Sequence, residues 1–172
     1  EDVNIGTNRG YYIDGTKVLS NEGFNNVFVG ENTSTSITSG SRNVFVGTHA
    51  GQSSTSAQRN VFIGNAAGSN VTSGQQNVFI GPSAGASIVY TFGNTFVGFQ
   101  AGRFNVGTAN SFFGKYAGVS CVYGNFNTYL GESAGRSTNN VARNTYVGRS
   151  AGENSASGSD NTYLGYEAGR TS

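Results

Sequence analysis

The sequence is poor in cysteine, proline, methionine, tryptophan and charged residues. Of its 172 residues one is Cys and one is Pro, and Met and Trp are absent. The single cysteine, Cys121, excludes an internal disulfide framework, and we expect it to be a small core residue. Charged residues are 11% of the chain and the net charge is +1, so nothing indicates a nucleic acid or an anionic membrane as a partner. No run approaches the roughly 18 apolar residues that a membrane-spanning helix needs.

Residue types that carry catalysis or bind metals are equally scarce. His49 is the one histidine, and aspartate occurs only at Asp2, Asp14 and Asp160. A Ser-His-Asp arrangement therefore has no support, and a calcium-binding β-roll, which needs an aspartate in every turn, is excluded. We expect His49 to be a solvent-facing loop residue, and we predict no enzymatic activity, no cofactor and no metal ion.

The chain does contain a repeat: Asn, a small or β-branched residue, Phe or Tyr, an apolar residue and Gly. An Ala-Gly pair follows at a constant offset in eight of the nine units. The spacing is 17 residues except between Asn94 and Asn110, where it is 16. The nine asparagines are Asn26, Asn43, Asn60, Asn77, Asn94, Asn110, Asn127, Asn144 and Asn161. Such a period predicts supersecondary units stacked on their neighbours, which usually serve as a scaffold, a shaft or a binding surface.

The composition of each unit indicates β-structure. Two recurrent glycines would each cost a helix about 1 kcal/mol relative to alanine, and residues 43–46 alternate in the manner of a strand. We predict an all-β fold, a right- or left-handed β-solenoid (a β-roll or β-helix) of about nine 17-residue rungs over residues 26–172. The asparagines would then stack their amides along its axis.

Two apolar columns follow from this arrangement. The residue after the aromatic is always large and apolar, and we expect this column to fill the interior: Val29, Val46, Ile63, Ile80, Val97, Phe113, Leu130, Val147 and Leu164. The aromatic column would face the other way and require a second interface: Phe28, Phe45, Phe62, Phe79, Phe96, Phe112, Tyr129, Tyr146 and Tyr163. The change to tyrosine in the last three units predicts that the hydroxyl reaches water or a partner.

Residues 1–25 lie outside the repeat. Residues 11–19 are typical of two short strands around the turn residues Asp14 and Gly15, and we expect this hairpin to cap the first edge of the solenoid. The chain begins with Glu1 and not with Met, so we expect a processed product or a fragment. No capping sequence is evident before Ser172, so we expect a neighbour or further chain to cover that end.

The pattern Asn-x-Phe-Val-Gly-x-x-Ala-Gly, preceded by the segment 11–20, resembles the repeats of phage tail-fibre and bacterial surface proteins. Many of those proteins carry a C-terminal intramolecular chaperone of the endosialidase type. The strand is also similar to the head repeats of trimeric autotransporter adhesins, although the period here is longer and the middle residue is aromatic. The resemblance spans residues 11–172. It implies a homotrimer of β-solenoid subunits, with one apolar column inside each coil and another at the trimer axis.

The middle of the array differs from the rest. No charged residue lies between Arg59 and Arg103, the loops become aromatic, and the 16-residue unit lies here. Aromatic side chains on loops form platforms for sugar rings or for a protein contact. The candidate receptor or subunit contacts are Tyr90, Phe92, Phe99, Phe104, Tyr116, Tyr123 and Phe126. Packing of these loops on sister chains is an alternative to a receptor site.

These observations predict a non-enzymatic structural or adhesive segment of an extracellular or virion fibre, with a cell-surface glycan or protein as its receptor. A self-assembling extracellular filament subunit is the alternative. Ice or mineral binding needs a flat outward array of threonines. The column of Thr95, Thr128, Thr145 and Thr162 is interrupted by Ser111 and is expected to face the interior, which disfavours that function.

Overall fold

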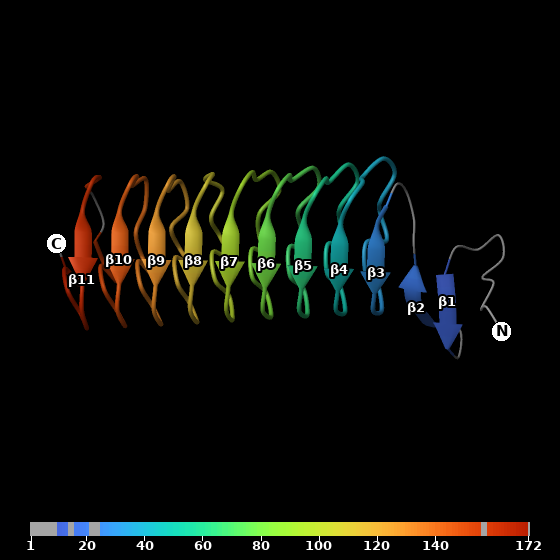
Figure 1. The fold of residues 1–172 in the computed structure, drawn as a ribbon, viewed down its shortest axis with the longest axis horizontal. Coiled ribbons are helices and arrows are strands. Elements are labelled where there is room, and N and C mark those ends of the chain that lie inside the picture. Colours follow the sequence, from blue (N-terminus) through green and yellow to red (C-terminus); the bar gives the residue numbers. More distant parts are fainter. Residues whose placement is uncertain (1–9, 14–15, 21–24, 156–157, 172) are drawn as a thin grey trace.

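The chain forms an all-β solenoid in a computed structural model that describes residues 10–13, 16–20, 25–155 and 158–171. Nine parallel strands, β3–β11, are stacked through about eight turns of a coil with a repeat of about 17 residues (Figure 1). The predicted fold class is therefore confirmed. None of the described residues belongs to a helix capable of crossing a membrane. The strands are β1 (Gly10–Ile13), β2 (Thr16–Ser20), β3 (Val27–Val29), β4 (Val44–Val46), β5 (Val61–Ile63), β6 (Val78–Ile80), β7 (Thr95–Val97), β8 (Ser111–Phe113), β9 (Thr128–Leu130), β10 (Thr145–Val147) and β11 (Thr162–Leu164).

The two strands expected before the repeat extend its sheet beyond the first rung. β1 pairs antiparallel with β2, and β2 pairs antiparallel with β3 through Leu19–Val29 and Ser20–Phe28. The outer edge of β3 is therefore covered by β2. The expected turn residues Asp14 and Gly15 lie outside the described residues, and the division of the chain at residue 25 stays a prediction.

Every repeat strand pairs in register with the equivalent strand of the next unit. Phe45 lies opposite Phe62, for example, and Val46 lies opposite Ile63. Because the pairing is in register from β3 to β11, each position of the repeat becomes one column that runs along the axis of the coil.

The aromatic column fills the interior. Phe45 and Phe62 are fully buried, and their rings stack with centroids 4.6 Å apart and planes 5° apart. The prediction that the residue after the aromatic faces inward is wrong, because Ile63 and Ile80 on that column are 37% and 36% exposed. An aromatic ring buries more apolar area than an aliphatic side chain and gains from stacking on its neighbours. The aromatic column is thus covered within one chain and needs no second interface.

The asparagine ladder shares the interior with the rings, and its prediction is confirmed. Oδ1 of Asn43 accepts hydrogen bonds from the backbone N–H of Asn60 (3.0 Å) and from its Nδ2 (3.1 Å). The same Nδ2 also donates to the carbonyl of Gly74 at 2.8 Å. A fully buried amide is stable here because its donors and acceptor are paired.

The Ala-Gly pair forms the small side of the core opposite each ring. Ala84 is fully buried, and Gly85 has a φ of +58°. A Cβ atom on Gly85 would lie 2.5 Å from the ring of Phe79, so only glycine fits there. The pair therefore sets the width of the coil to that of one aromatic ring.

The hydroxyls of Tyr129 and Tyr146 stay inside the coil, which contradicts for these two residues the prediction that the hydroxyl reaches water or a partner. The hydroxyl of Tyr129 lies 3.2 Å from Oγ1 of Thr138, and that of Tyr146 donates to Oγ of Ser155 at 3.3 Å. Each hydroxyl thus has a hydroxyl partner within its own unit, nine residues along the chain.

Candidate functional site

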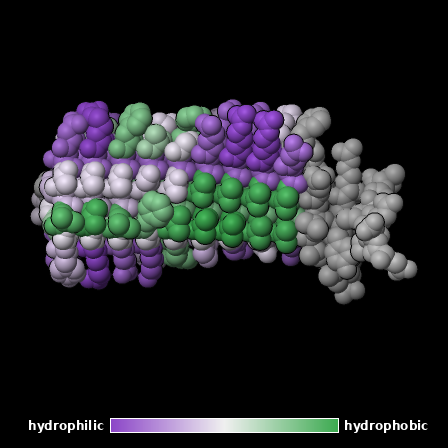
Figure 2. Space-filling view, in the orientation of Figure 1, coloured by the Kyte–Doolittle hydropathy of each residue, from purple (hydrophilic) through white to green (hydrophobic). Residues whose placement is uncertain are grey.

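The outer face of the parallel sheet carries the aliphatic side chains that were expected inside. Figure 2 shows two apolar files side by side over β3–β6, and one apolar file beside paler residues over the later strands. Over β3–β6 both outward positions are Val or Ile, and Val27, Ile63 and Ile80 are more than a third exposed. Contiguous apolar surface of this kind commonly marks a protein contact.

The threonine column also lies on this outer face. Thr128, Thr145 and Thr162 are exposed, so the expectation that they face the interior is wrong. Each threonine lies two residues before a member of the aliphatic column, and residues two apart on a strand share one side. The two columns therefore face outward together. The array is still interrupted by Ser111, and it covers only β7–β11, since the earlier strands have valine at this position.

Charged side chains gather at the edges of the later units. Glu132 lies between Lys115 and Arg149, with nitrogen–oxygen distances of 3.8 and 3.6 Å. Arg143 donates to Asp160 at 2.6 Å, and this hydrogen bond lowers the pKa of the Asp160 carboxyl. These pairs are exposed and contribute little to stability. They all lie after residue 102, whereas residues 60–102 contain no charged residue.

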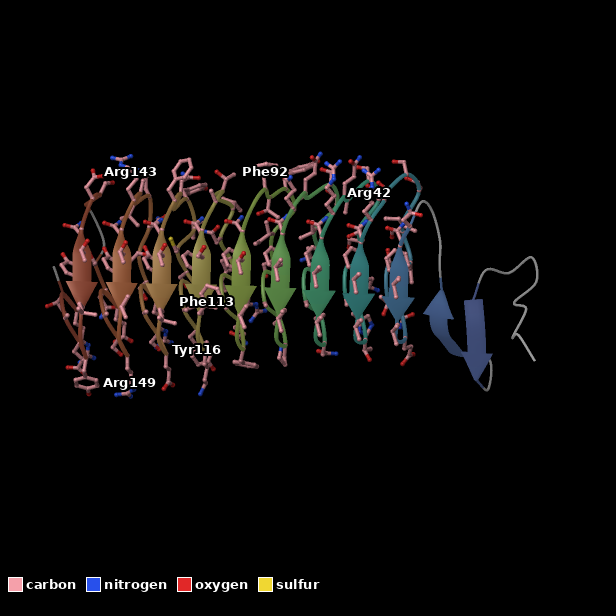
Figure 3. All side chains as sticks on the ribbon, in the orientation of Figure 1. Arg42, Phe92, Phe113, Tyr116, Arg143 and Arg149 are labelled. Atoms are coloured by element: carbon pink, nitrogen blue, oxygen red, sulfur yellow. The ribbon has the colours of Figure 1, made fainter. Side chains whose placement is uncertain are left out.

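The predicted contact residues do not form one cluster. Figure 3 places Phe92 and Tyr116 at opposite edges of the solenoid. Phe99 meets Tyr116 edge to face, with centroids 5.4 Å apart, and Nζ of Lys115 lies 5.1 Å from the centre of the Tyr116 ring. Phe104 is contacted by the guanidinium of Arg103 at 5.0 Å. These three aromatic residues thus have partners of their own.

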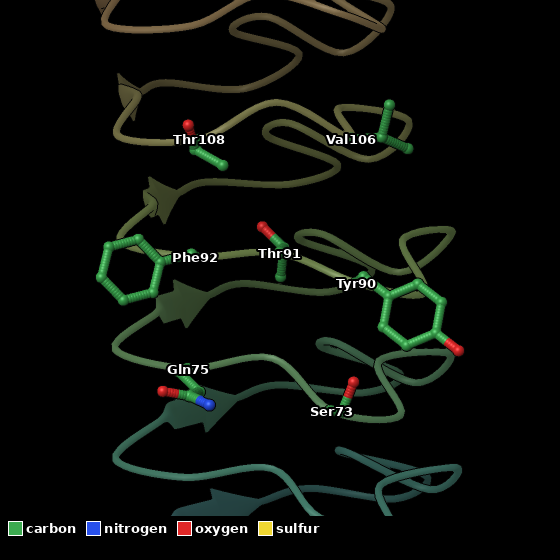
Figure 4. Close-up of a pocket in the computed structure, with 7 residues that line it drawn as sticks. All are labelled: Ser73, Gln75, Tyr90, Thr91, Phe92, Val106 and Thr108. Carbon is green, nitrogen blue, oxygen red and sulfur yellow. The ribbon is translucent and has the colours of Figure 1, made fainter.

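A hollow of about 440 Å³ lies on the edge that carries Phe92, opposite the edge that carries Tyr116 (Figure 4). It is lined by Ser73, Gln75, Tyr90, Thr91, Phe92, Val106 and Thr108. Of the predicted residues, only Tyr90 and Phe92 line it. Tyr123 and Phe126 are 60% and 61% exposed and belong to the unit that follows the short one, outside the lining. Their role as contact residues stays a prediction.

Sequence reasoning missed the polar part of this lining. Ser73, Gln75 and Thr108 are ordinary loop residues by type, and no pattern of their own distinguishes them. The signal that does point to them is the 16-residue unit, since Val106 and Thr108 belong to it and the other lining residues belong to the two preceding units.

Titratable groups in the interior are neutral and enclosed. Burial raises the pKa of the Cys121 thiol and of the Tyr129 and Tyr146 hydroxyls above their ordinary values. Cys121 is a buried core residue, as expected. His49 is half-buried, and its Nε2 lies 3.4 Å from Nδ2 of Asn32. Across the described part of the chain, no three residues among His, Cys, Asp and Glu lie close enough to hold a metal ion.

Comparison of the chain with models of protein families, with curated proteins and with solved structures finds no match.

Proposed function

We propose that the chain is a non-enzymatic structural and adhesive segment of an extracellular or virion fibre. The observation that carries this proposal is the continuity of the interior columns. Ring stacking extends without interruption from Phe28 to Tyr163, at centroid distances between 4.6 and 5.1 Å. Eight rung spacings give a rod of roughly 38 Å. Such a rod suits a shaft, because every rung has the same contacts with its neighbours.

The adhesive part of the proposal is supported by the loops. The strand and the Ala-Gly pair are nearly invariant from unit to unit, whereas the loops vary from serine-rich to aromatic. Large aromatic side chains in the loops of the middle units are exposed, including Tyr90 at 68% and Tyr123 at 60%. Variable loops on a rigid scaffold are where binding residues are commonly found.

We further propose that the segment is a homotrimer, with the outer face of β3–β6 as the contact between subunits. The exposed aliphatic side chains of this face support the trimer, whereas the aromatic column is buried within one chain and does not. The outward side chains of these four strands cover roughly 200 Å², estimated from strand spacing and residue rise. A standard interface buries about 800 Å² per partner, so the columns beside this face must also take part in the contact.

The proposed function is tested by locating the protein and measuring its mass. Antibodies against the chain are applied to intact cells and particles of the source organism, and labelling is compared before and after protease treatment of the surface. We expect surface labelling, and a discrete trimer by light scattering. Labelling only after cells are permeabilised would overturn the proposal. Fibres that lengthen with protein concentration would instead support a filament subunit.

A further inference from the structure

The hollow borders the unit that is one residue short. Count the asparagine of each unit as place 1. The backbone N–H of Val106 donates to the carbonyl of Val122 (2.7 Å), which occupies place 13. Nδ2 of Asn94 donates to the carbonyl of Gly107 (2.8 Å), the bond that other units make to place 15. The residue missing between Val106 and Gly107 is therefore that of place 14.

Tyrosine occupies place 14 in both neighbouring units. Tyr90 precedes the short unit and Tyr123 follows it, and both are among the most exposed large side chains. The deletion thus removes the one side chain that would stand between two exposed tyrosines in the same column. Their backbone positions are two rung spacings apart, roughly 10 Å, which is more than the width of a single sugar ring.

The lining combines apolar rings with uncharged hydrogen-bonding groups. Figure 4 shows Tyr90 and Phe92 on either side of Thr91, with Val106 and Thr108 on the adjacent rung. Hydroxyl and amide groups are supplied from neighbouring rungs, for example by Gln75. No charged residue lines the hollow. An anionic or cationic ligand would therefore lose its hydration without gaining a counter-charge, which is unfavourable.

Backbone pairing disfavours a peptide strand as the ligand. Gln75 N–H donates to the carbonyl of Thr91, Gly93 N–H donates to that of Gln75, and Ala109 N–H donates to that of Phe92. These main-chain groups are already paired between rungs and are not available to add a strand. A ligand with apolar C–H faces and many hydroxyl groups suits exposed aromatic rings beside neutral polar side chains.

We propose that this hollow binds an uncharged oligosaccharide that lies along the solenoid axis across the short unit. One sugar stacks on Tyr90 beside Phe92, a later sugar contacts Tyr123, and Gln75 and Thr108 exchange hydrogen bonds with the hydroxyl groups. The missing place 14 leaves the room for the chain of sugars between the two tyrosines. This proposal rests on the adhesive function proposed above and specifies the chemistry of its receptor.

The test uses the full chain on an array of uncharged oligosaccharides of glucose, galactose, mannose and N-acetylglucosamine, with sialylated and sulfated sugars for comparison. We expect binding to an uncharged member, confirmed by calorimetry. Tyr90→Ala and Tyr123→Ala should each weaken it about tenfold. The matched control is Tyr166→Ala, which removes an exposed tyrosine from a later unit, and it should leave binding unchanged.

A second variant fills the hollow without removing an aromatic residue. Insertion of a serine between Val106 and Gly107 restores the 17-residue period, which the other units tolerate, so it should keep the melting temperature and abolish binding. The proposal is overturned if this variant still binds, or if charged sugars bind equally well. A lower oligomer mass in Tyr90→Ala also overturns it, because the hollow would then be a subunit contact.

Failure of this proposal differs from failure of the proposed function. A chain found on the cell or particle surface that binds no uncharged oligosaccharide overturns only the saccharide site. A chain absent from the surface contradicts the fibre, whatever the array shows.

Discussion

Oδ1 of Asn60 accepts two hydrogen bonds from Asn77, one from its backbone N–H at 3.0 Å and one from its Nδ2 at 2.9 Å. Asn60 also donates to the carbonyl of Gly74. Because both asparagines are fully buried, no water can replace these bonds if the side chain is lost. With the bond from its Nδ2 to Oδ1 of Asn43, the side chain of Asn60 is bonded to four polar groups of other residues.

Replacement of that residue should be costly. Asn60→Ala leaves two donors of Asn77 without their acceptor in the interior. It also removes one of the two hydrogen bonds to the Gly74 carbonyl, which keeps the one from the backbone N–H of Gln58. We therefore expect a loss of roughly 3–5 kcal/mol in the free energy of unfolding. Urea denaturation measures it. Asn65→Ala is the matched control, because this exposed asparagine belongs to the same unit and should change stability by less than about 0.5 kcal/mol. Similar losses for both variants would contradict the ladder as a source of stability.

Two glycines that both have positive φ should respond differently to alanine. Gly85→Ala places a Cβ 2.5 Å from the ring of Phe79, and that ring cannot move because it is stacked on both sides. We expect a loss of roughly 2–4 kcal/mol. At Gly93 the nearest atom to an added Cβ is 4.0 Å away, and the equivalent residue of the next unit is Ala109, also at positive φ. Gly93→Ala should cost only about 1 kcal/mol, the penalty of a positive φ without a clash. Equal midpoints of thermal unfolding for the two variants would contradict this account.

The architecture could be predicted because the period dictates the register. Each Asn-x-aromatic unit becomes a strand paired with its copy, as at Phe45 and Phe62. The choice of the inner side could not be made by hydropathy, which favours Val46 over Asn43. The decisive signal was that Asn43 and Phe45 share one side of the strand, so a buried amide ladder requires buried rings. Pairing of polar groups between rungs outweighed the apolar character of the aliphatic column.

The sequence indicated the middle units as the place of the candidate site, but it did not indicate which of their aromatic residues lie together. Aromatic type alone placed Tyr90 with Tyr116, although the structure separates the edge that carries Phe92 from the edge that carries Tyr116 (Figure 3). Position within the unit is the better guide, since it determines the edge on which a side chain lies. By that criterion Tyr90 and Tyr123 belong together, and the shortened unit between them marks the hollow.

Stability should fall at alkaline pH. Burial raises the pKa of the Cys121 thiol and of the Tyr129 and Tyr146 hydroxyls, whose ordinary values are 9.0 and 10.0. Below these ordinary values each group is protonated in both the folded and the unfolded chain, so its contribution to the free energy of unfolding is fully present. Above about pH 9 the unfolded chain releases protons that the folded chain retains, so unfolding becomes more favourable by up to about 1.4 kcal/mol per pH unit for each group. Urea denaturation between pH 7 and pH 11 measures this decline.

Tyr129→Phe isolates one of these groups. Phenylalanine fills the same column in six other units, and Oγ1 of Thr138 keeps its hydrogen bond to the carbonyl of Gly135 at 3.0 Å. The stacked ring therefore remains while the buried hydroxyl is lost. We expect a shallower decline above pH 10 in this variant, and parallel curves for variant and parent would show that the buried hydroxyl does not cause the decline.

The aliphatic face makes a prediction about assembly. Ile63 and Ile80 are 37% and 36% exposed in one chain, so a lysine at either position can reach water in a monomer. In a subunit contact through β3–β6 the same ammonium group would be buried without a partner, which is strongly unfavourable. The double variant Ile63→Lys with Ile80→Lys should therefore have the mass of a monomer by light scattering, with a melting temperature that no longer depends on protein concentration. Leu164→Lys is the matched control, because it adds a lysine to the same column at β11 and should leave the mass of the assembly unchanged. A parent protein that is monomeric at every concentration, or a double variant with the parent's mass, would show that this face does not join subunits.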